Sequence, residues 1–136
     1  MNTMRLQIIS PRKVLFDGNC TMLEYNTTEG YVGILPGHVA MTQILAPGKL
    51  VIYEENKPKP TYMAAMSGIS KIMPDTVMLL LEIAELKEEI DIERAKIAKK
   101  KAEDCIANNK DSFEVERAKF SLKKAEARLE VAAISV

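Results

Sequence analysis

The sequence predicts a segregated α+β protein, with an N-terminal β-sandwich over residues 1–84 and an antiparallel two-helix hairpin over residues 85–136. Three observations support this fold class. Turn residues recur roughly every 8–12 residues up to about residue 82, the spacing of an all-β sandwich or barrel. From residue 90 onward the chain lacks proline and glycine and is rich in good helix formers. An apolar content of 47% with 28% charged residues fits a folded chain of one ordinary domain or two small ones.

Short apolar or alternating runs mark the expected strands. Residues 4–8 alternate between apolar and polar side chains, which predicts a half-buried strand. A second run begins at Val14, and Asp17-Gly18 predicts a turn before a third strand over 20–25. Two prolines mark 56–60 as a loop. The remaining strands of this region are expected over residues 49–54, 62–66, 69–73 and 77–81.

The stretch 29–45, EGYVGILPGHVAMTQIL, contains three of the six glycines and the only histidine. Its Pro36-Gly37 pair predicts a tight turn, because proline presets φ and glycine accepts a positive φ. The apolar runs on either side predict two buried strands that meet at a corner.

The helical region divides into two segments. Asp91 is the expected N-cap of the first helix, and Asn108–Lys110 break the pattern. Asp111 with Glu114 three residues later predicts a capping box for the second helix. The expected contact seams are Ala95, Ala98, Ala102 and Cys105 on the first helix, and Ala118, Leu122, Ala125, Leu129 and Ala132 on the second. Because alanine buries little apolar area, we expect a hairpin of modest stability that can exchange this packing for another.

Composition and charge exclude several functions. Lysine plus arginine and aspartate plus glutamate balance at 19 each, so the whole molecule has no basic field for nucleic acid. Cys20 and Cys105 are expected to be reduced, and two cysteines make neither a secreted framework nor a zinc site. No apolar run approaches the ~20 residues of a membrane span, and no signal peptide is evident. His38 and Cys20 lack the partners of a catalytic site, so we expect no catalytic and no metal-binding residue.

The stretch GYVGILPGHVAMTQIL resembles the signature of epsilon subunits of F-type ATP synthases, and the resemblance extends over essentially the whole chain. It implies a non-catalytic rotor subunit, peripheral on the cytoplasmic face of the membrane, whose sandwich couples the gamma subunit to the ring of c subunits. It also implies that the loop at Glu29, Gly30 and Tyr31 and the turn around His38 face the gamma subunit and the ring. The residues that match at family spacing are Gly30, Gly33, Ile34, Pro36, Gly37 and His38.

Residues 90–95, IDIERA, admit two interpretations. On their own they predict an N-cap aspartate, a surface pair of Asp91 with Arg94 and the start of a helix seam. They also resemble the nucleotide-binding motif of some bacterial epsilon subunits, which implies a regulatory ATP between the helices and no required cofactor. Lys101 and Lys124 stand where ATP-binding members carry arginine, and a lysine lacks the bidentate fork. The matching positions are Glu85, Ile90, Asp91, Arg94, Ala95, Lys101, Lys124 and Arg128.

Basic residues on both predicted helices are by themselves typical of a solvated face. Acidic residues interleave them and aromatic residues are scarce, which argues against nucleic-acid binding. The resemblance implies instead that residues such as Arg117 and Lys123 approach an acidic segment of the catalytic beta subunit when the hairpin extends. The folded hairpin then permits ATP hydrolysis and the extended one inhibits it. The alternative is a stand-alone adaptor, with a sandwich platform and a helical docking hairpin.

Overall fold

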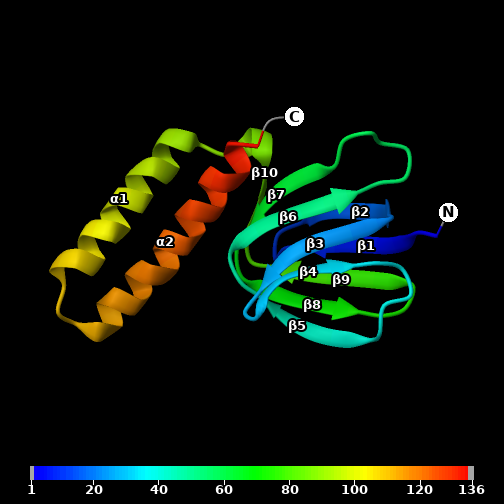
Figure 1. Ribbon diagram of the computed structural model, residues 1–136, viewed down its shortest axis with the longest axis horizontal. Coiled ribbons are helices and arrows are strands. Elements are labelled where there is room, and N and C mark those ends of the chain that lie inside the picture. The colour runs from blue at the N-terminus through cyan, green and yellow to red at the C-terminus, as the bar shows by residue number, and fades with distance from the viewer. Residues whose placement is uncertain (1, 135–136) are drawn as a thin grey trace.

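The computed structural model describes residues 2–134, which form a β-sandwich with a two-helix hairpin at one side (Figure 1). The predicted fold class is confirmed. The strands are β1 Met4–Ile9, β2 Val14–Cys20, β3 Met22–Thr27, β4 Gly30–Ile34, β5 Met41–Leu45, β6 Gly48–Tyr53, β7 Thr61–Ala65, β8 Gly68–Ile72, β9 Thr76–Leu81 and β10 Ala84–Leu86. A 3-10 turn, η1 Lys87–Glu89, leads to the helices α1 Ile92–Asn108 and α2 Ser112–Ala132.

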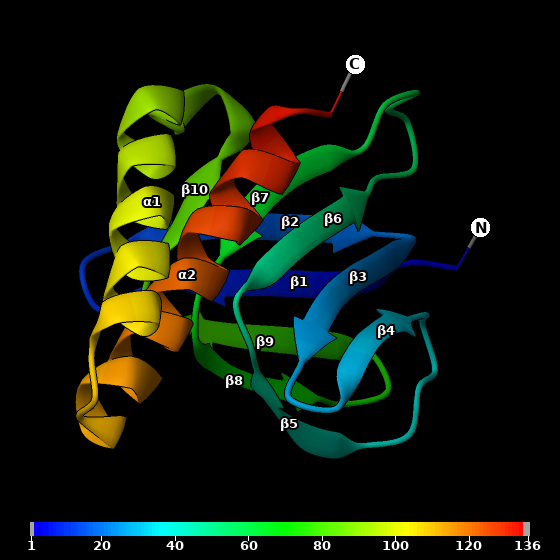
Figure 2. The ribbon, with the colours of Figure 1, turned by 60° about the vertical axis from the view of Figure 1, so that its left-hand side comes forward.

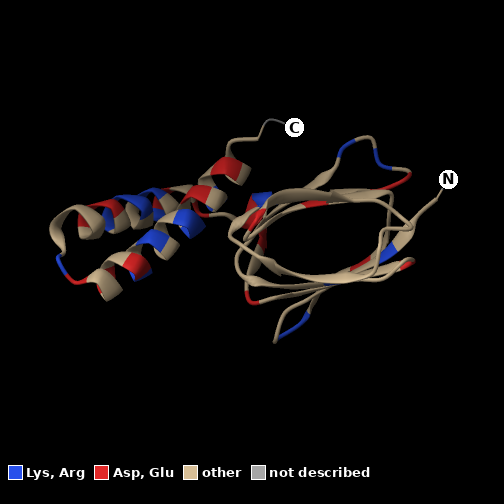
Figure 3. Ribbon diagram, turned by 60° about the horizontal axis from the view of Figure 1, so that its bottom comes forward, with Lys and Arg blue, Asp and Glu red and all other residues tan. Residues whose placement is uncertain are grey.

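The strands follow one hydrogen-bonded path that folds back on itself to make two layers. The path runs β10-β7-β6-β3-β5-β8-β9-β1-β2, and β4 pairs with β3 at its side. The pairs are antiparallel except β1 with β9, which is parallel. A single bridge, Thr27 to Leu45, joins the two layers through β3 and β5. The ribbon therefore looks like a flattened ring when it is viewed end-on (Figure 3).

Aliphatic side chains from both layers fill the interior of the sandwich. Alternation along each strand sends Leu6 and Ile8 of β1 inward, together with Leu79 and Leu81 of β9, and all four are almost inaccessible to water. Tyr25 is the largest of the fully buried side chains. Its hydroxyl lies 2.8 Å from the side-chain oxygen of Gln43 and 3.0 Å from the hydroxyl of Ser70, so the phenol is buried with its polar group satisfied.

The helical hairpin forms as expected. The Asp91 carboxylate accepts a hydrogen bond from the backbone N–H of Arg94 at 3.1 Å, which caps α1. The helix ends at Asn108, at the predicted break. Ala95 and Ala102 of α1 are buried, as are Ala118 and Ala125 of α2, so small side chains line the contact between the helices. The expected alanine seam is confirmed.

Only one of the two hydrogen bonds of the capping box predicted for the second helix forms, so that prediction is half wrong. Asp111 is the N-cap and accepts from the backbone N–H of Phe113 at 2.9 Å. The backbone N–H of Asp111 donates to the side chain of Asn109 rather than to Glu114. Glu114 instead pairs with Arg117 one turn along the helix, at 3.4 Å. The asparagine in the turn thus satisfies the donor that the capping box would have used.

A second face of α2, which the sequence pattern did not predict, packs on the sandwich. Ala127 and Val131 are buried on this face. Val131 contacts Ala64 and Met66 at the outer face of the β7 region, together with Ile90. Figure 2 shows α2 lying between α1 and the β6–β7 layer. This contact fixes the hairpin to the sandwich at the C-terminal end of α2.

The turn predicted at Asp17-Gly18 is wrong, because both residues lie inside β2. Asp17 pairs with Gln7 and Gly18 pairs with Leu6. The Asp17 carboxylate accepts two hydrogen bonds from Arg5 of β1, each at 3.2 Å, and this contact supports the strand pair. The guanidinium holds the pKa of the Asp17 carboxyl below its usual range. The chain reverses at Thr21 instead.

The two strands expected to be buried around Pro36-Gly37 are largely exposed. β4 pairs only with β3, and β4 and β5 each bury only their last residue, Ile34 and Leu45. The turn itself is confirmed, since the His38 N–H donates to the Leu35 carbonyl at 3.2 Å and Gly37 has a φ of 85°. An apolar run at the edge of a sheet cannot be distinguished from a buried one by composition alone.

Candidate functional site

A cavity of about 390 Å³ lies between the first turn of α1 and the C-terminal half of α2. It brings together five of the eight residues expected at a nucleotide site, Glu85, Asp91, Arg94, Ala95 and Arg128, together with Glu89 and Ala98. Glu85 comes from β10, Asp91 caps α1, and Arg128 lies on α2. The Arg128 guanidinium donates to the Glu85 carboxylate at 2.5 Å, and both side chains are about two-thirds buried.

The charges in this cavity are mixed. Three carboxylates, those of Glu85, Glu89 and Asp91, face the guanidinium groups of Arg94 and Arg128. The Glu89 carboxylate accepts a hydrogen bond from the backbone N–H of Leu86 at 2.9 Å. This bond also orders the 3-10 turn that leads from β10 to α1. The carboxylates of the site can accept hydrogen bonds from a donor-rich group, and an anion bound by Arg128 would have to displace Glu85 from that guanidinium.

The other three expected nucleotide residues lie elsewhere. Ile90 is 8% exposed and points into the cluster beneath α2. Lys101 lines a separate cavity of about 480 Å³ nearer the helix turn, which Arg117 also lines. The Lys124 ammonium lies 5.1 Å from the ring centre of Phe120. The eight residues expected at the nucleotide site therefore do not all line one cavity.

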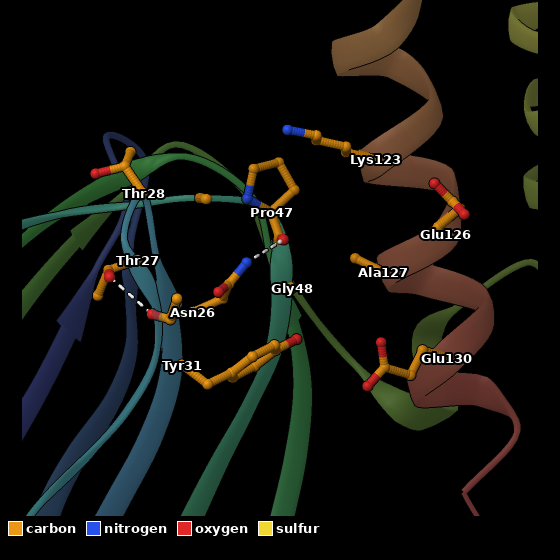
Figure 4. A pocket seen from close by; sticks show the side chains of 12 residues that line it. Asn26, Thr27, Thr28, Tyr31, Pro47, Gly48, Lys123, Glu126, Ala127 and Glu130 are labelled. Carbon is orange, nitrogen blue, oxygen red and sulfur yellow. Dashed lines mark hydrogen bonds between the residues drawn. The ribbon is translucent and has the colours of Figure 1, made fainter.

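A wedge-shaped cavity of about 560 Å³ separates α2 from the end of the sandwich (Figure 4). Its sandwich wall consists of the β3–β4 turn and the β5–β6 turn, with the side chain of Tyr31 lying along β6. The Tyr31 hydroxyl accepts from the backbone N–H of Lys49 at 3.0 Å. The α2 wall includes Lys123, Glu126 and Glu130. Three expected partner-contact residues, Gly30, Tyr31 and Lys123, therefore line one cavity.

The remaining expected partner contacts are dispersed. Glu29 is exposed at the tip of the β3–β4 turn. His38 follows the opposite end of β4, where its Nδ1 lies 2.8 Å from the Val39 carbonyl. Arg117 lies over the ring of Phe113 on α2. Because β4 separates the Glu29 turn from His38, one small contact patch cannot include both.

A row of exposed aliphatic residues crosses the layer that the hairpin leaves uncovered. Ile44, Ile69 and Leu80 are 60%, 48% and 47% exposed. They are cross-strand neighbours on β5, β8 and β9, and Leu80 continues the row to Ile9 of β1. We call these four residues the apolar row. The helices contact the other layer, through β6 and β7. Exposed aliphatic side chains in one continuous row are typical of a protein interface.

The sequence contains a signal for this row. Leu79, Leu80 and Leu81 are consecutive in one strand, and alternation requires the middle one to point opposite to its neighbours. Leu79 and Leu81 are buried and Leu80 is exposed. An uninterrupted leucine run beside a half-exposed layer therefore indicates apolar surface on the outer face.

Two family profiles match almost the whole chain. The ATP synthase delta/epsilon chain β-sandwich domain matches residues 3–87, and the corresponding long α-helix domain matches residues 88–133. The chain belongs to the ATP synthase delta/epsilon chain family. Like the other members, this delta/epsilon chain is a non-catalytic subunit.

Relatives from several bacteria support the assignment. An ATP synthase epsilon chain of Thermobifida fusca is 41% identical over 100 residues, covering 72% of this chain and 73% of the relative. One from Alkalihalophilus pseudofirmus is 35% identical over 103 residues, with 76% of each chain covered. One from Clostridium novyi is 37% identical over 103 residues, covering 75% of this chain and 77% of the relative.

Two solved structures share the fold. A chain in the Euglena gracilis mitochondrial ATP synthase superposes with a TM-score of 0.85 at 24% identity, covering 97% of this chain and 82% of the other. A chain in the central stalk and c-ring of the Tetrahymena thermophila mitochondrial ATP synthase gives 0.70 at 14% identity, covering 97% and 98%. At these identities the likeness concerns the fold alone.

Further properties of residues 2–134 bear on the site. No group of three or more histidine, cysteine, aspartate or glutamate side chains within this range could hold a metal ion. No helix in the described range has both the length and the apolar character needed to cross a bilayer.

Both cysteines are free thiols, as expected. Burial, with a smaller contribution from Glu54, raises the pKa of the Cys20 thiol to about 11. A raised pKa lowers the fraction of thiolate, which is the form that a nucleophilic cysteine needs.

Proposed function

We propose that this delta/epsilon chain is a central-stalk rotor subunit that couples ion translocation to ATP synthesis or hydrolysis. Membership of the family supports this role. Its partners would be the gamma subunit, the ring of c subunits and the catalytic beta subunit, at the cytoplasmic face of the membrane. The Tetrahymena structure with the same fold comprises a central stalk and c-ring.

The apolar row carries this proposal. It is the face that neither helix covers, and each of Ile44, Ile69 and Leu80 is about half exposed. We assign this row to the gamma subunit, because burying a continuous aliphatic row gives a stable contact without charge pairing. The Glu29–Tyr31 turn and the His38 turn lie at opposite ends of β4, so each would contact a different surface of the gamma subunit or the ring.

A charge placed in the apolar row tests this assignment. Ile69→Glu should lower the affinity of the full chain for the gamma subunit by at least about tenfold, because a carboxylate would be buried without a partner. Ile97→Glu on α1, where Ile97 is 68% exposed, is the matched control and should leave the affinity within about twofold. Titration calorimetry measures both. Equal affinity for both variants would contradict the assignment, and no affinity of the unmodified chain would favour the stand-alone adaptor.

The hairpin would regulate hydrolysis by changing position. Its contact with the sandwich uses Ala127, Val131 and Ala132, with the ion pairs Glu85–Arg128 and Lys49–Glu130. The α2 residues of this contact lie within positions 127–132, a short part of the 21-residue helix. An element held this weakly can exchange its packing for another at moderate cost. We assign the folded position to permitted hydrolysis and the extended position to inhibition. In the extended position Arg117 and Lys123 would approach the acidic segment of the beta subunit.

ATP bound in the 390 Å³ cavity would favour the folded hairpin, because α1, α2 and β10 together form its walls. Asp91 and nearby backbone would accept from the adenine amine, while Arg94 and Arg128 would hold phosphate oxygens. Arg128 is already paired with Glu85, so binding would exchange one anionic partner for another.

Two single substitutions test the nucleotide site. Asp91→Ala and Arg128→Ala should each weaken ATP binding by about tenfold, the loss expected for one charge-assisted hydrogen bond. Lys124→Ala is the control, because Lys124 lines neither interhelical cavity. Calorimetric titration of the full chain measures the affinities, and circular dichroism confirms that the sandwich stays folded. An unchanged affinity in both test variants, or a loss only in Lys124→Ala, would contradict the site.

A further inference from the structure

The β3–β4 hairpin reaches across to the start of β6 with two polar side chains. Asn26 and Tyr31 lie directly opposite each other on this hairpin. The Asn26 amide donates to the Pro47 carbonyl at 3.1 Å, and the Tyr31 hydroxyl accepts from the backbone N–H of Lys49 at 3.0 Å. Figure 4 shows both side chains pointing toward the strand that begins at Gly48. We call Asn26, Tyr31 and Gly48 the clamp.

Gly48 makes this close approach possible. A Cβ at this position would lie 2.7 Å from the Asn26 Cβ and 2.7 Å from the Tyr31 hydroxyl, which is closer than real side chains come. The φ of Gly48 lies outside the left-handed region, so the requirement for glycine is steric. The pairing of β3 with β6 ends at Val51. Tyr31 therefore supplies the acceptor that a strand partner would have given to the Lys49 N–H.

Lys49 connects the clamp to α2. Its backbone N–H is held by Tyr31, and its ammonium lies 4.0 Å from the Glu130 carboxylate. Gly48 and Ala127 line the same wedge-shaped cavity, and Ala127 is buried. Helix α2 also contacts β6 directly. The start of β6 is thus held by the β3–β4 hairpin on one side and supports α2 on the other.

We propose that the clamp couples the β3–β4 turn to the docking of α2. The contact of α2 with the sandwich lies within positions 127–132, so a shift of the β6 support changes a large part of what holds the hairpin. A rotor partner that displaces the Glu29–Tyr31 turn withdraws the Tyr31 hydroxyl from Lys49 and favours release of the hairpin. By linkage, a docked α2 favours the clamped turn by the same free energy. The identity of that partner rests on the proposed function, whereas the coupling is a property of the free chain.

Hydrogen exchange of the free full chain tests the coupling with single substitutions. Tyr31→Phe keeps the ring and removes only the hydroxyl, so it should raise the exchange rates of the amides over positions 125–132 about threefold. Glu130→Gln should raise them about twofold, because an exposed ion pair stabilises little. Tyr53→Phe removes a hydroxyl that bonds to Glu24 at the far end of β6. It is the matched control and should leave exchange in α2 unchanged.

The double variant separates coupling from two independent effects. If the clamp acts on α2 through Lys49, Tyr31→Phe combined with Glu130→Gln should raise exchange by no more than about threefold, against about sixfold for independent effects. The Lys49 amide reports the reciprocal effect, and its exchange should also be faster in Glu130→Gln. A sixfold rise in the double variant, unchanged α2 exchange in Tyr31→Phe, or an equal response to Tyr53→Phe would overturn the proposal. Failure of the chain to bind the gamma subunit would instead overturn the proposed function and leave the measured coupling as it is.

Discussion

The surroundings of Tyr53 and Cys20, two titratable side chains of the sandwich, determine their chemistry. The Tyr53 hydroxyl lies 2.5 Å from a carboxylate oxygen of Glu24, and that hydrogen bond chiefly raises the pKa of Tyr53 to about 12. Cys20 is wholly buried, and its raised pKa keeps it a neutral thiol at physiological pH. The Tyr53 hydroxyl therefore stays protonated beside Glu24, and the Cys20 thiol is kept away from solvent.

The two cysteines should therefore differ in reactivity. At pH 8 an alkylating reagent should modify Cys105 at least about a hundredfold faster than Cys20, because Cys20 is buried and almost entirely protonated. Cys105 is half-buried on α1. Peptide mass spectrometry after timed labelling measures both rates, with a sample in denaturant as the control in which the rates converge. Comparable rates in the folded protein would contradict the description of Cys20.

Residue-level prediction succeeded where one local rule determines the outcome. Asp91 and Asp111 both cap helices, and Gly37 has the positive φ that its turn needs. It failed at Asp17-Gly18, where a turn-forming pair lies inside a strand because Arg5 on the neighbouring strand binds Asp17. It also missed the exposure of Phe113 and Phe120, which depends on where α2 leaves the sandwich. Cross-strand and interdomain contacts are long-range, so local propensity cannot reveal them.

At the scale of elements, α2 joins the two parts of the molecule. Its alanines face α1 on one side, and Ala127 with Val131 faces the sandwich on another. The sequence predicted the first seam because alanines recur at helical spacing. The sequence did not predict the second contact face, because Ala127 and Val131 lie outside the alanine stripe that the pattern showed. Five residues that the resemblance implied for a nucleotide site line one cavity, because α1, α2 and β10 bring them together.

A bulky residue in the first seam should separate the helices without unfolding the sandwich. Ala125 is fully buried, so Ala125→Leu should destabilise the hairpin by about 2 kcal/mol through overpacking. Ala107→Leu, at an exposed position of α1, is the matched control. Hydrogen exchange measures the result, with faster exchange expected in α1 and α2 and unchanged exchange in β1 and β9. Slower exchange, or no difference from the control, would contradict the packing described for the seam.

At the scale of the whole molecule, the sandwich and the hairpin present different surfaces. Charged residues gather on the helices, whereas the sandwich strands carry few of them (Figure 3). The apolar row lies on the sandwich layer away from α2. This division fits a subunit whose sandwich stays bound to a rotor while its hairpin changes position. The family resemblance predicted that division, but only the register of β5, β8 and β9 located the row.

The most direct test of this account is ATP hydrolysis by a reconstituted catalytic head carrying either the full chain or a chain that ends after Glu89. Ending there keeps β10 and η1, which pair with or contact β7. We expect both forms to bind equally through the sandwich and the truncated form to give faster hydrolysis, because the hairpin can no longer extend. Equal hydrolysis rates with both forms fully bound would contradict a regulatory hairpin.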